Sequence, residues 1–222
     1  MATGLEAPRP AADRQWFIVG RWEEFEGEAR ANLLRVIALA AFYAVELVNY
    51  HGLRLGVLEM PQVVDRPFHL AVTVLTAGWA MVCLAVLWCR RQHYFPAALK
   101  YLSTGCDLLL LTTILALADG PRSPLVVGYF LVLATAALRF NLPLVWFATA
   151  GAAAGYLFLI GHVKWYVAAE RSQQMRVPRY HEVIFLLAVV LTGVILGQLL
   201  RRVRRLAEHY AQRVEQTRGG TP

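Results

Sequence analysis

The stretch VIFLLAVVLTGVILGQLL, residues 183–200, has no charged side chain and is followed at once by the basic run RRVRR. An α-helix rises about 1.5 Å per residue, so about 20 apolar residues cross the roughly 30 Å hydrocarbon core of a bilayer. Five more apolar segments precede this one, at residues 32–50, 68–89, 98–118, 125–138 and 142–161. The segment 125–138 is the weakest, because it is short enough to be a re-entrant segment instead. We predict an all-α fold, a polytopic membrane bundle with six transmembrane helices.

The overall composition excludes a water-soluble protein. Of the 222 residues, 58% are hydrophobic and 17% are charged, and the mean hydropathy is +0.46. Soluble domains typically have about 25% charged and about 45–50% apolar residues. Soluble enzymes, disordered chains and secreted disulfide scaffolds are therefore excluded. The cysteines Cys83, Cys89 and Cys106 lie in or beside apolar segments without zinc or redox spacing, so we expect buried thiols.

The distribution of Lys and Arg predicts the orientation in the membrane. The net charge is +7, and of 22 Lys and Arg residues fifteen, including Arg35 and Arg139, fall on the side of the N-terminus, against seven on the other. Cytoplasmic loops carry the excess of positive charge, which predicts two cytoplasmic termini in a bacterial inner membrane. The basic residues suit lipid headgroups, so we expect no nucleic-acid partner. The predicted domains are a cytoplasmic or interfacial segment (1–31), a transmembrane domain (32–200) and a basic cytoplasmic helical tail (201–222).

Residues 15–30, with the sequence QWFIVGRWEEFEGEAR, mix four aromatic side chains with charged ones. Aromatic side chains favour the headgroup layer, which predicts an interfacial helix leading into the first span. A docking surface for a partner is the alternative interpretation.

The basic tail continues the helical pattern of the last span. Leu199, Val203, Leu206 and Tyr210 recur with heptad spacing. This stripe predicts that the last helix extends past the bilayer, either as a stalk that forms a homodimer or as a simple stop-transfer anchor. Four basic residues suited to anionic lipid lie beside the stripe: Arg201, Arg202, Arg204 and Arg205.

Two acidic residues fall inside predicted spans, Glu46 near the outer end of the first and Asp107 near the middle of the third. Ionisable residues in a bilayer are costly and are candidates for function. We expect Asp107 to be protonated and to donate a hydrogen bond between helices. One interpretation is a structural clasp with Thr104, Thr112 or Thr113, and the other is a proton or ligand site.

A set of histidines falls at the outer ends of the predicted spans. Imidazoles and carboxylates that meet at this level could hold a transition metal, bind a quinone headgroup or titrate between about pH 5 and 8. Separate interfacial histidines are the alternative, because no two of them share a metal-binding spacing on one helix. The members of this outer set are His51, His69, His162, His181 and Glu182.

Small residues mark the fifth and sixth spans, at Gly151 and Gly155 and at Gly193 and Gly197. A Gly-x-x-x-Gly spacing lets two helices approach closely. We expect these two spans to pack against each other or across a dimer.

The chain has no phosphate-binding loop, no zinc-protease or serine-hydrolase motif and no segment outside the membrane long enough for a catalytic domain. We therefore expect no enzymatic activity and no cofactor, and whether a metal binds stays open.

A loose pattern runs through the third and fourth spans: Asp107, then Gly120, Ser123, Pro124, Leu125, Tyr129 and the small residues 134–137. It resembles the six-helix membrane input modules of bacterial sensor histidine kinases and class III nucleotide cyclases. The resemblance implies two cytoplasmic ends and a sixth helix that continues into a signalling stalk. This chain departs from that pattern because no kinase or cyclase domain follows, so the enzymatic activity is not implied.

Three functional hypotheses follow. The first is a stand-alone sensor or anchor module that relays a membrane or periplasmic signal through its sixth helix to a cytoplasmic partner. The second is a small proton-linked transporter that uses Asp107, and the third is an intramembrane enzyme acting on lipid or quinone. Membrane lipids are expected partners in each.

Overall fold

The structure is a computed structural model that describes residues 11–55, 58–60, 64–92, 98–167 and 175–219. It is a helical bundle with one small hairpin. The elements are α1 (Ala11–His51), β1 (Leu53–Leu55), β2 (Leu58–Met60), α2 (Arg66–Arg91), α3 (Ala98–Leu117), η1 (Gly120–Arg122), η2 (Pro124–Val127), α4 (Gly128–Ala137), α5 (Leu142–Trp165) and α7 (Arg179–Gly219).

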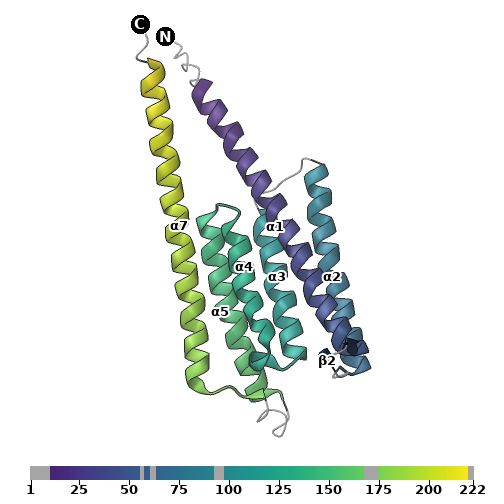
Figure 1. Ribbon diagram of the computed structural model, residues 1–222. Coiled ribbons are helices and arrows are strands. Elements are labelled where there is room, and N and C mark those ends of the chain that lie inside the picture. The colour runs from purple at the N-terminus through teal and green to yellow at the C-terminus, as the bar shows by residue number, and fades with distance from the viewer. Residues whose placement is uncertain (1–10, 56–57, 61–63, 93–97, 168–174, 220–222) are drawn as a thin grey trace, which may run out of the picture.

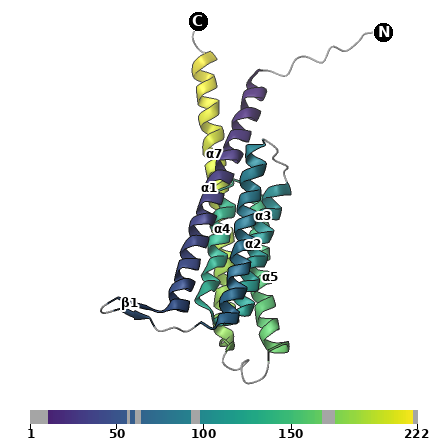
Figure 2. The same cartoon turned by 90° about the vertical axis from the view of Figure 1, so that its right-hand side faces the viewer.

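The helices run up and down alternately, and α1 and α7 are much longer than the others (Figure 1). Each has 41 residues, and both project beyond the bundle at the same end of the molecule. The antiparallel hairpin, in which Leu53 is opposite Met60, lies at the other end (Figure 2). The sequence did not predict this hairpin in the link after the first span.

Within the described residues, five helices are long and apolar enough to cross a membrane: Gly27–His51, Arg66–Cys89, Ala98–Leu117, Leu142–Trp165 and Arg179–Ala207. They correspond to five of the six predicted spans. The outside of these helices is apolar, with Val74, Leu109 and Ile195 largely exposed, while several charged residues are buried. Apolar side chains outside and charges inside are compatible with lipid as the solvent.

The predicted span 125–138 is found as a short apolar helix, Pro124–Ala137, which is shorter than the five long helices. It begins as the 3₁₀ turn η2 and continues as the ten-residue helix α4. Pro121 and Pro124 stand at the starts of η1 and η2, and the Ser123 hydroxyl oxygen accepts a hydrogen bond from the backbone N–H of Leu125. Proline and a capping serine favour new helix starts, which explains why this helix begins at Pro124 and is separate from α3.

The predicted boundary between an interfacial helix and the first span also differs. α1 is uninterrupted from Ala11, and Gly27, Glu28 and Ala31 are already buried in the bundle. Packing therefore begins before residue 32, because α1 lies against the turn between α4 and α5, residues 138–141.

The apolar core lies between α3, α4, α5 and α7, around the buried rings of Tyr129 and Tyr156. The packing of α5 against α7 is confirmed, since Gly193 and Gly197 of α7 face Thr149 and Trp146 of α5. The other predicted pair of glycines faces elsewhere. A Cβ atom at Gly151 would meet Leu108 of α3, and one at Gly155 would meet Thr112 of α3 and Tyr129 of α4.

Gly27 allows the closest approach of α1 to the turn. A Cβ atom there would lie 2.8 Å from the carbonyl oxygen of Leu138, which is backbone and has little freedom to move. We expect Gly27→Ala to lower the free energy of unfolding by about 1–3 kcal/mol through overpacking. Gly78→Ala is the control, because nothing lies within 4 Å of a Cβ at that position.

The measurement is thermal unfolding of both variants in detergent. Gly78→Ala should leave the midpoint unchanged or raise it, because alanine favours a helix by about 0.5–1 kcal/mol over glycine. Equal midpoints for the two variants would contradict the close approach.

Candidate functional site

Asp107 of α3 forms a buried ion pair with Arg35 of α1. The Nη2 and Nε atoms of Arg35 donate to Oδ2 at 2.7 and 3.0 Å, and the indole Nε1 of Trp79 on α2 donates to Oδ1 at 2.8 Å. Nη1 of Arg35 donates to the side-chain oxygen of Asn32 at 3.1 Å. The side chains of Arg35 and Asp107 are 4% and 5% exposed. Three helices are therefore joined at one carboxylate.

The predicted state and partners of Asp107 are wrong. Both of its oxygens accept hydrogen bonds, so it is the anionic partner of an arginine and not a protonated donor. The three threonine hydroxyls instead donate to main-chain oxygens one turn earlier, Thr104 to Lys100, Thr112 to Leu108 and Thr113 to Leu109.

A second buried ion pair joins the start of the bundle to the α4–α5 turn. Nε and Nη2 of Arg139 lie 2.8 Å from Oε2 and Oε1 of Glu28, respectively. Nη1 donates to Oγ1 of Thr104 at 2.6 Å and to the carbonyl oxygen of Lys100 at 2.9 Å, and Nη2 donates to Oγ of Ser103 at 3.0 Å. Arg139 thus holds α1 and α3 to the turn that follows α4.

The same turn also contacts α7. Nη2 of Arg204 donates to the carbonyl oxygen of Phe140 at 2.7 Å, and Phe140 itself has a left-handed backbone with φ 49°. The two longest helices, α1 and α7, are therefore each bonded to adjacent residues of one turn.

Glu46, the other predicted intramembrane acid, pairs with His69 of α2. Its Oε1 lies 2.8 Å from Nδ1 of His69, and the ring of Tyr50 stacks on that imidazole at 3.9 Å between centroids. Oε2 of Glu46 is buried and has no hydrogen-bond partner among the residues that the structure describes. Leaving a buried polar atom without a hydrogen bond costs about 1–3 kcal/mol of stability, so a ligand that donates to this oxygen would be favoured.

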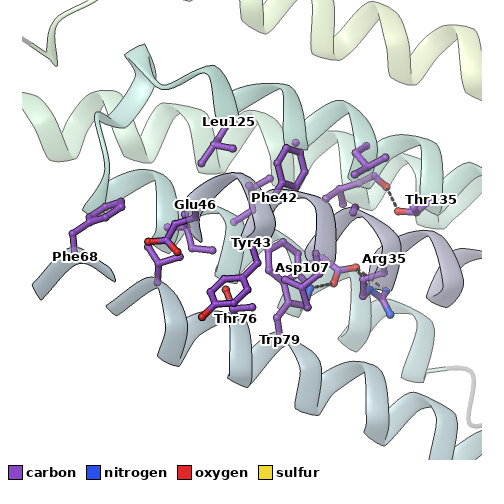
Figure 3. Close-up of a pocket in the computed structure, with 18 residues that line it drawn as sticks. Arg35, Phe42, Tyr43, Glu46, Phe68, Thr76, Trp79, Asp107, Leu125 and Thr135 are labelled. Atoms are coloured by element: carbon purple, nitrogen blue, oxygen red, sulfur yellow. Dashed lines mark hydrogen bonds and ion pairs between the residues drawn. The ribbon is translucent and has the colours of Figure 1, made fainter. Parts of the chain in front are cut away.

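An apolar pocket of about 110 Å³ lies between these two polar sites. Figure 3 shows Arg35, Asp107 and Trp79 together at one end and Glu46 and Phe68 towards the other. Arg35 and Glu46, at the two ends of the pocket, are eleven positions apart on α1, roughly 16 Å at 1.5 Å per residue. Its walls come from α1, α2, α3, η2 and α4, and most of the lining is aliphatic or aromatic.

The predicted outer set does not form one site. Among the residues that the structure describes, no three His, Cys, Asp or Glu side chains are placed to hold a metal ion. His69 pairs with Glu46, whereas the other histidines make local ring contacts: His51 with Tyr50, His162 with Phe158 and Tyr166, and His181 with Tyr180. Glu182 lies in the first turn of α7.

The predicted extension of the last helix is confirmed, because α7 continues to Gly219. Leu199, Val203 and Leu206 of the heptad stripe are exposed, and the side chain of Tyr210 lies outside the described residues. Arg201, Arg202 and Arg205 are exposed beside the stripe.

Sequence reasoning missed the roles of Glu28, Arg35, Trp79 and Arg139. The two arginines were counted as charges that set the orientation, although both are buried. One signal was available, because Glu28, Asn32 and Arg35 are spaced four and three residues apart and so share one helix face. Three polar side chains on one face at the start of a span indicate polar packing.

Comparisons with models of protein families, with curated proteins and with solved structures give no match for this chain. The resemblance to membrane input modules therefore stays a prediction.

Proposed function

We propose that this chain is a sensor and anchor module of the bacterial inner membrane. In this proposal both ends are cytoplasmic, and α1 and α7 pass the conformation of the bundle to a cytoplasmic signalling partner. The observation that carries the proposal is that the α4–α5 turn binds both long helices, through Glu28–Arg139 on one side and Arg204–Phe140 on the other.

The contacts at the turn offer a physical route for relay. A continuous helix transmits shift or rotation along its length, and α1 and α7 are each uninterrupted across the bundle and beyond it. A movement of α1 pulls Arg139 through its ion pair, and Phe140 beside it is bonded to α7. A change in one helix therefore reaches the other without passing through the apolar core.

The ion pair of Asp107 favours this function over proton-linked transport. A transport carboxylate must release and take up a proton, whereas both oxygens of Asp107 already accept hydrogen bonds from Arg35 and Trp79. Asp107 is better suited to pin α1, α2 and α3 together. Proton-linked flux in liposomes that disappears in Asp107→Asn would replace the sensor function with transport.

Spin labels on the two projecting helices test the relay. We would label Gly20→Cys and Ala211→Cys in a background without the three native cysteines, and measure the distance distribution in nanodiscs of short-chain and long-chain phosphatidylcholine. The wild-type distribution should shift between the two bilayers, and Arg204→Ala should remove most of that shift. Arg201→Ala, an exposed arginine of the same helix, is the matched control and should keep it. The relay would be refuted if the wild-type distance distribution were the same in both bilayers, or if Arg204→Ala and Arg201→Ala kept the same shift.

Disulfide crosslinking tests whether α7 also forms a dimer stalk. The apolar positions Val203 and Leu206 are exposed, and burying such a stripe between two copies is the usual reason for heptad spacing. We expect Val203→Cys and Leu206→Cys to crosslink in membranes and Arg205→Cys, which is off the stripe, to crosslink several-fold less. Equal crosslinking at all three positions would contradict the dimer stalk and favour a simple stop-transfer anchor.

A further inference from the structure

We propose that the pocket along α1 binds a lipid-soluble aliphatic alcohol, whose hydroxyl donates a hydrogen bond to Oε2 of Glu46 and whose apolar body lies towards Arg35. The binding site is inferred from the geometry of the pocket. That the bound ligand is the signal passed on by α1 and α7 rests on the proposed function.

The size and walls of the pocket fix the apolar part of the ligand. A cavity of about 150 Å³ with aliphatic and aromatic walls holds one benzene ring, and this pocket has about 110 Å³. Its lining residues on α1 run from Arg35 to Glu46. Because the pocket is smaller than that benzene cavity but elongated, it suits a narrow aliphatic chain and excludes a substituted ring or a bulky polar metabolite.

The free carboxylate oxygen of Glu46 fixes the polar part. The Glu46 side chain is 11% exposed, and His69 occupies its Oε1, which leaves Oε2 buried without a partner among the described residues. Four other polar side chains of the wall have partners: Arg35 and Trp79 bond to Asp107, Tyr43 bonds to Thr73, and Thr135 bonds to the carbonyl oxygen of Val132. The structure thus offers an acceptor that lacks a donor at one end of an apolar pocket.

A neutral hydroxyl matches this acceptor better than a charged group does. A ligand that enters from lipid must lose its hydration first, and this costs far more for an ammonium group than for a hydroxyl. Phe42 of α1 lines the pocket and is also 41% exposed on the outside of the bundle. Because α1 is apolar and lipid-facing there, entry from the bilayer needs no polar channel.

Photolabelling with a matched pair of probes tests the site. The probes are a long-chain primary alcohol that carries a diazirine and the methyl ether of the same molecule, which lacks the hydroxyl donor. In nanodiscs of wild-type protein, the alcohol should label lining residues such as Leu131 and Val132 about three- to tenfold more than the ether does, the range expected for one buried hydrogen bond. Equal labelling by the two probes would overturn the hydroxyl class of ligand.

Two variants locate the site. Glu46→Leu should abolish the preference for the alcohol while labelling by the ether persists. Ala38→Phe places a ring in the pocket and should reduce labelling by both probes, whereas Ala41→Phe is the control, because Ala41 is exposed on α1 and does not line the pocket. If Glu46→Leu fails to fold, as judged by size-exclusion chromatography, the comparison of the two phenylalanine variants still decides. Equal labelling in these two variants would refute the pocket as the site.

The labelling is independent of the relay. If labelling depends on the hydroxyl but the spin-label distances do not change between the two bilayers, the binding site stands and the proposed function is refuted. If the distances change but labelling does not depend on the hydroxyl, the proposed function stands and the binding site is refuted.

Discussion

Asp107→Asn is expected to lower the free energy of unfolding by about 3–5 kcal/mol, because it leaves the guanidinium of Arg35 buried without its counter-charge. The asparagine has nearly the same shape, so the loss reports the charge and not a cavity. For a chain of this size the thermal midpoint in detergent should fall by roughly 10 °C. Asp119→Asn is the matched control, because Asp119 is exposed at the end of α3, and it should change stability by less than about 0.5 kcal/mol.

The double variant Arg35→Gln with Asp107→Asn separates the pair from its parts. Removing both charges leaves two neutral amides that can bond to each other, so the double variant should recover most of the stability that the single variant loses. If Asp107→Asn is as stable as Asp119→Asn, Arg35 and Asp107 are not paired in the membrane. If the double variant is as unstable as Asp107→Asn, the unpaired charge of Arg35 is not the cause of the lost stability.

Arg139→Gln is expected to be similarly destabilising, by about 3–5 kcal/mol, because Glu28 then remains charged and buried without a partner. Arg139 also bonds Ser103, Thr104 and the carbonyl of Lys100, so the variant frees the turn from α3 as well as from α1. The thermal midpoint should fall, and hydrogen exchange of the backbone amides in residues 138–141 should become faster.

Arg201→Gln is the matched control for that variant, because Arg201 is exposed on α7. It should leave both the midpoint and the exchange of the turn unchanged. A midpoint loss in Arg139→Gln without faster exchange in the turn would mean that the arginine stabilises α3 alone and does not hold the turn to α1.

The spans could be predicted from the sequence because lipid imposes a simple requirement of length and polarity on each helix. Five of them are found where they were expected. The 3₁₀ turn that begins the short helix Pro124–Ala137 was harder to predict, since the apolar composition of residues 125–138 is uniform. Pro121, Ser123 and Pro124 decide the local geometry there, and these are backbone effects that hydropathy does not measure.

The buried ion pairs could not be predicted in the same way. A count of Lys and Arg treats each as a charge at a membrane surface, whereas Arg35 and Arg139 find partners 72 and 111 residues away in the sequence. Which face of α1 meets α3 is a property of the packed bundle. Glu46 and His69 were both singled out from the sequence, but their pairing with each other emerged only from the structure.

The α4–α5 turn has a consequence for how the protein is made. The turn is synthesised before α7, yet one of its carbonyl oxygens is bonded by Arg204 of α7, which comes 64 residues later. In an inserted chain that has not yet received α7 this exposed carbonyl has only water as its partner, next to the paired arginine. The turn is therefore bonded to α1 before it is bonded to α7, and the contact between the two long helices is completed only after Arg204 has been inserted.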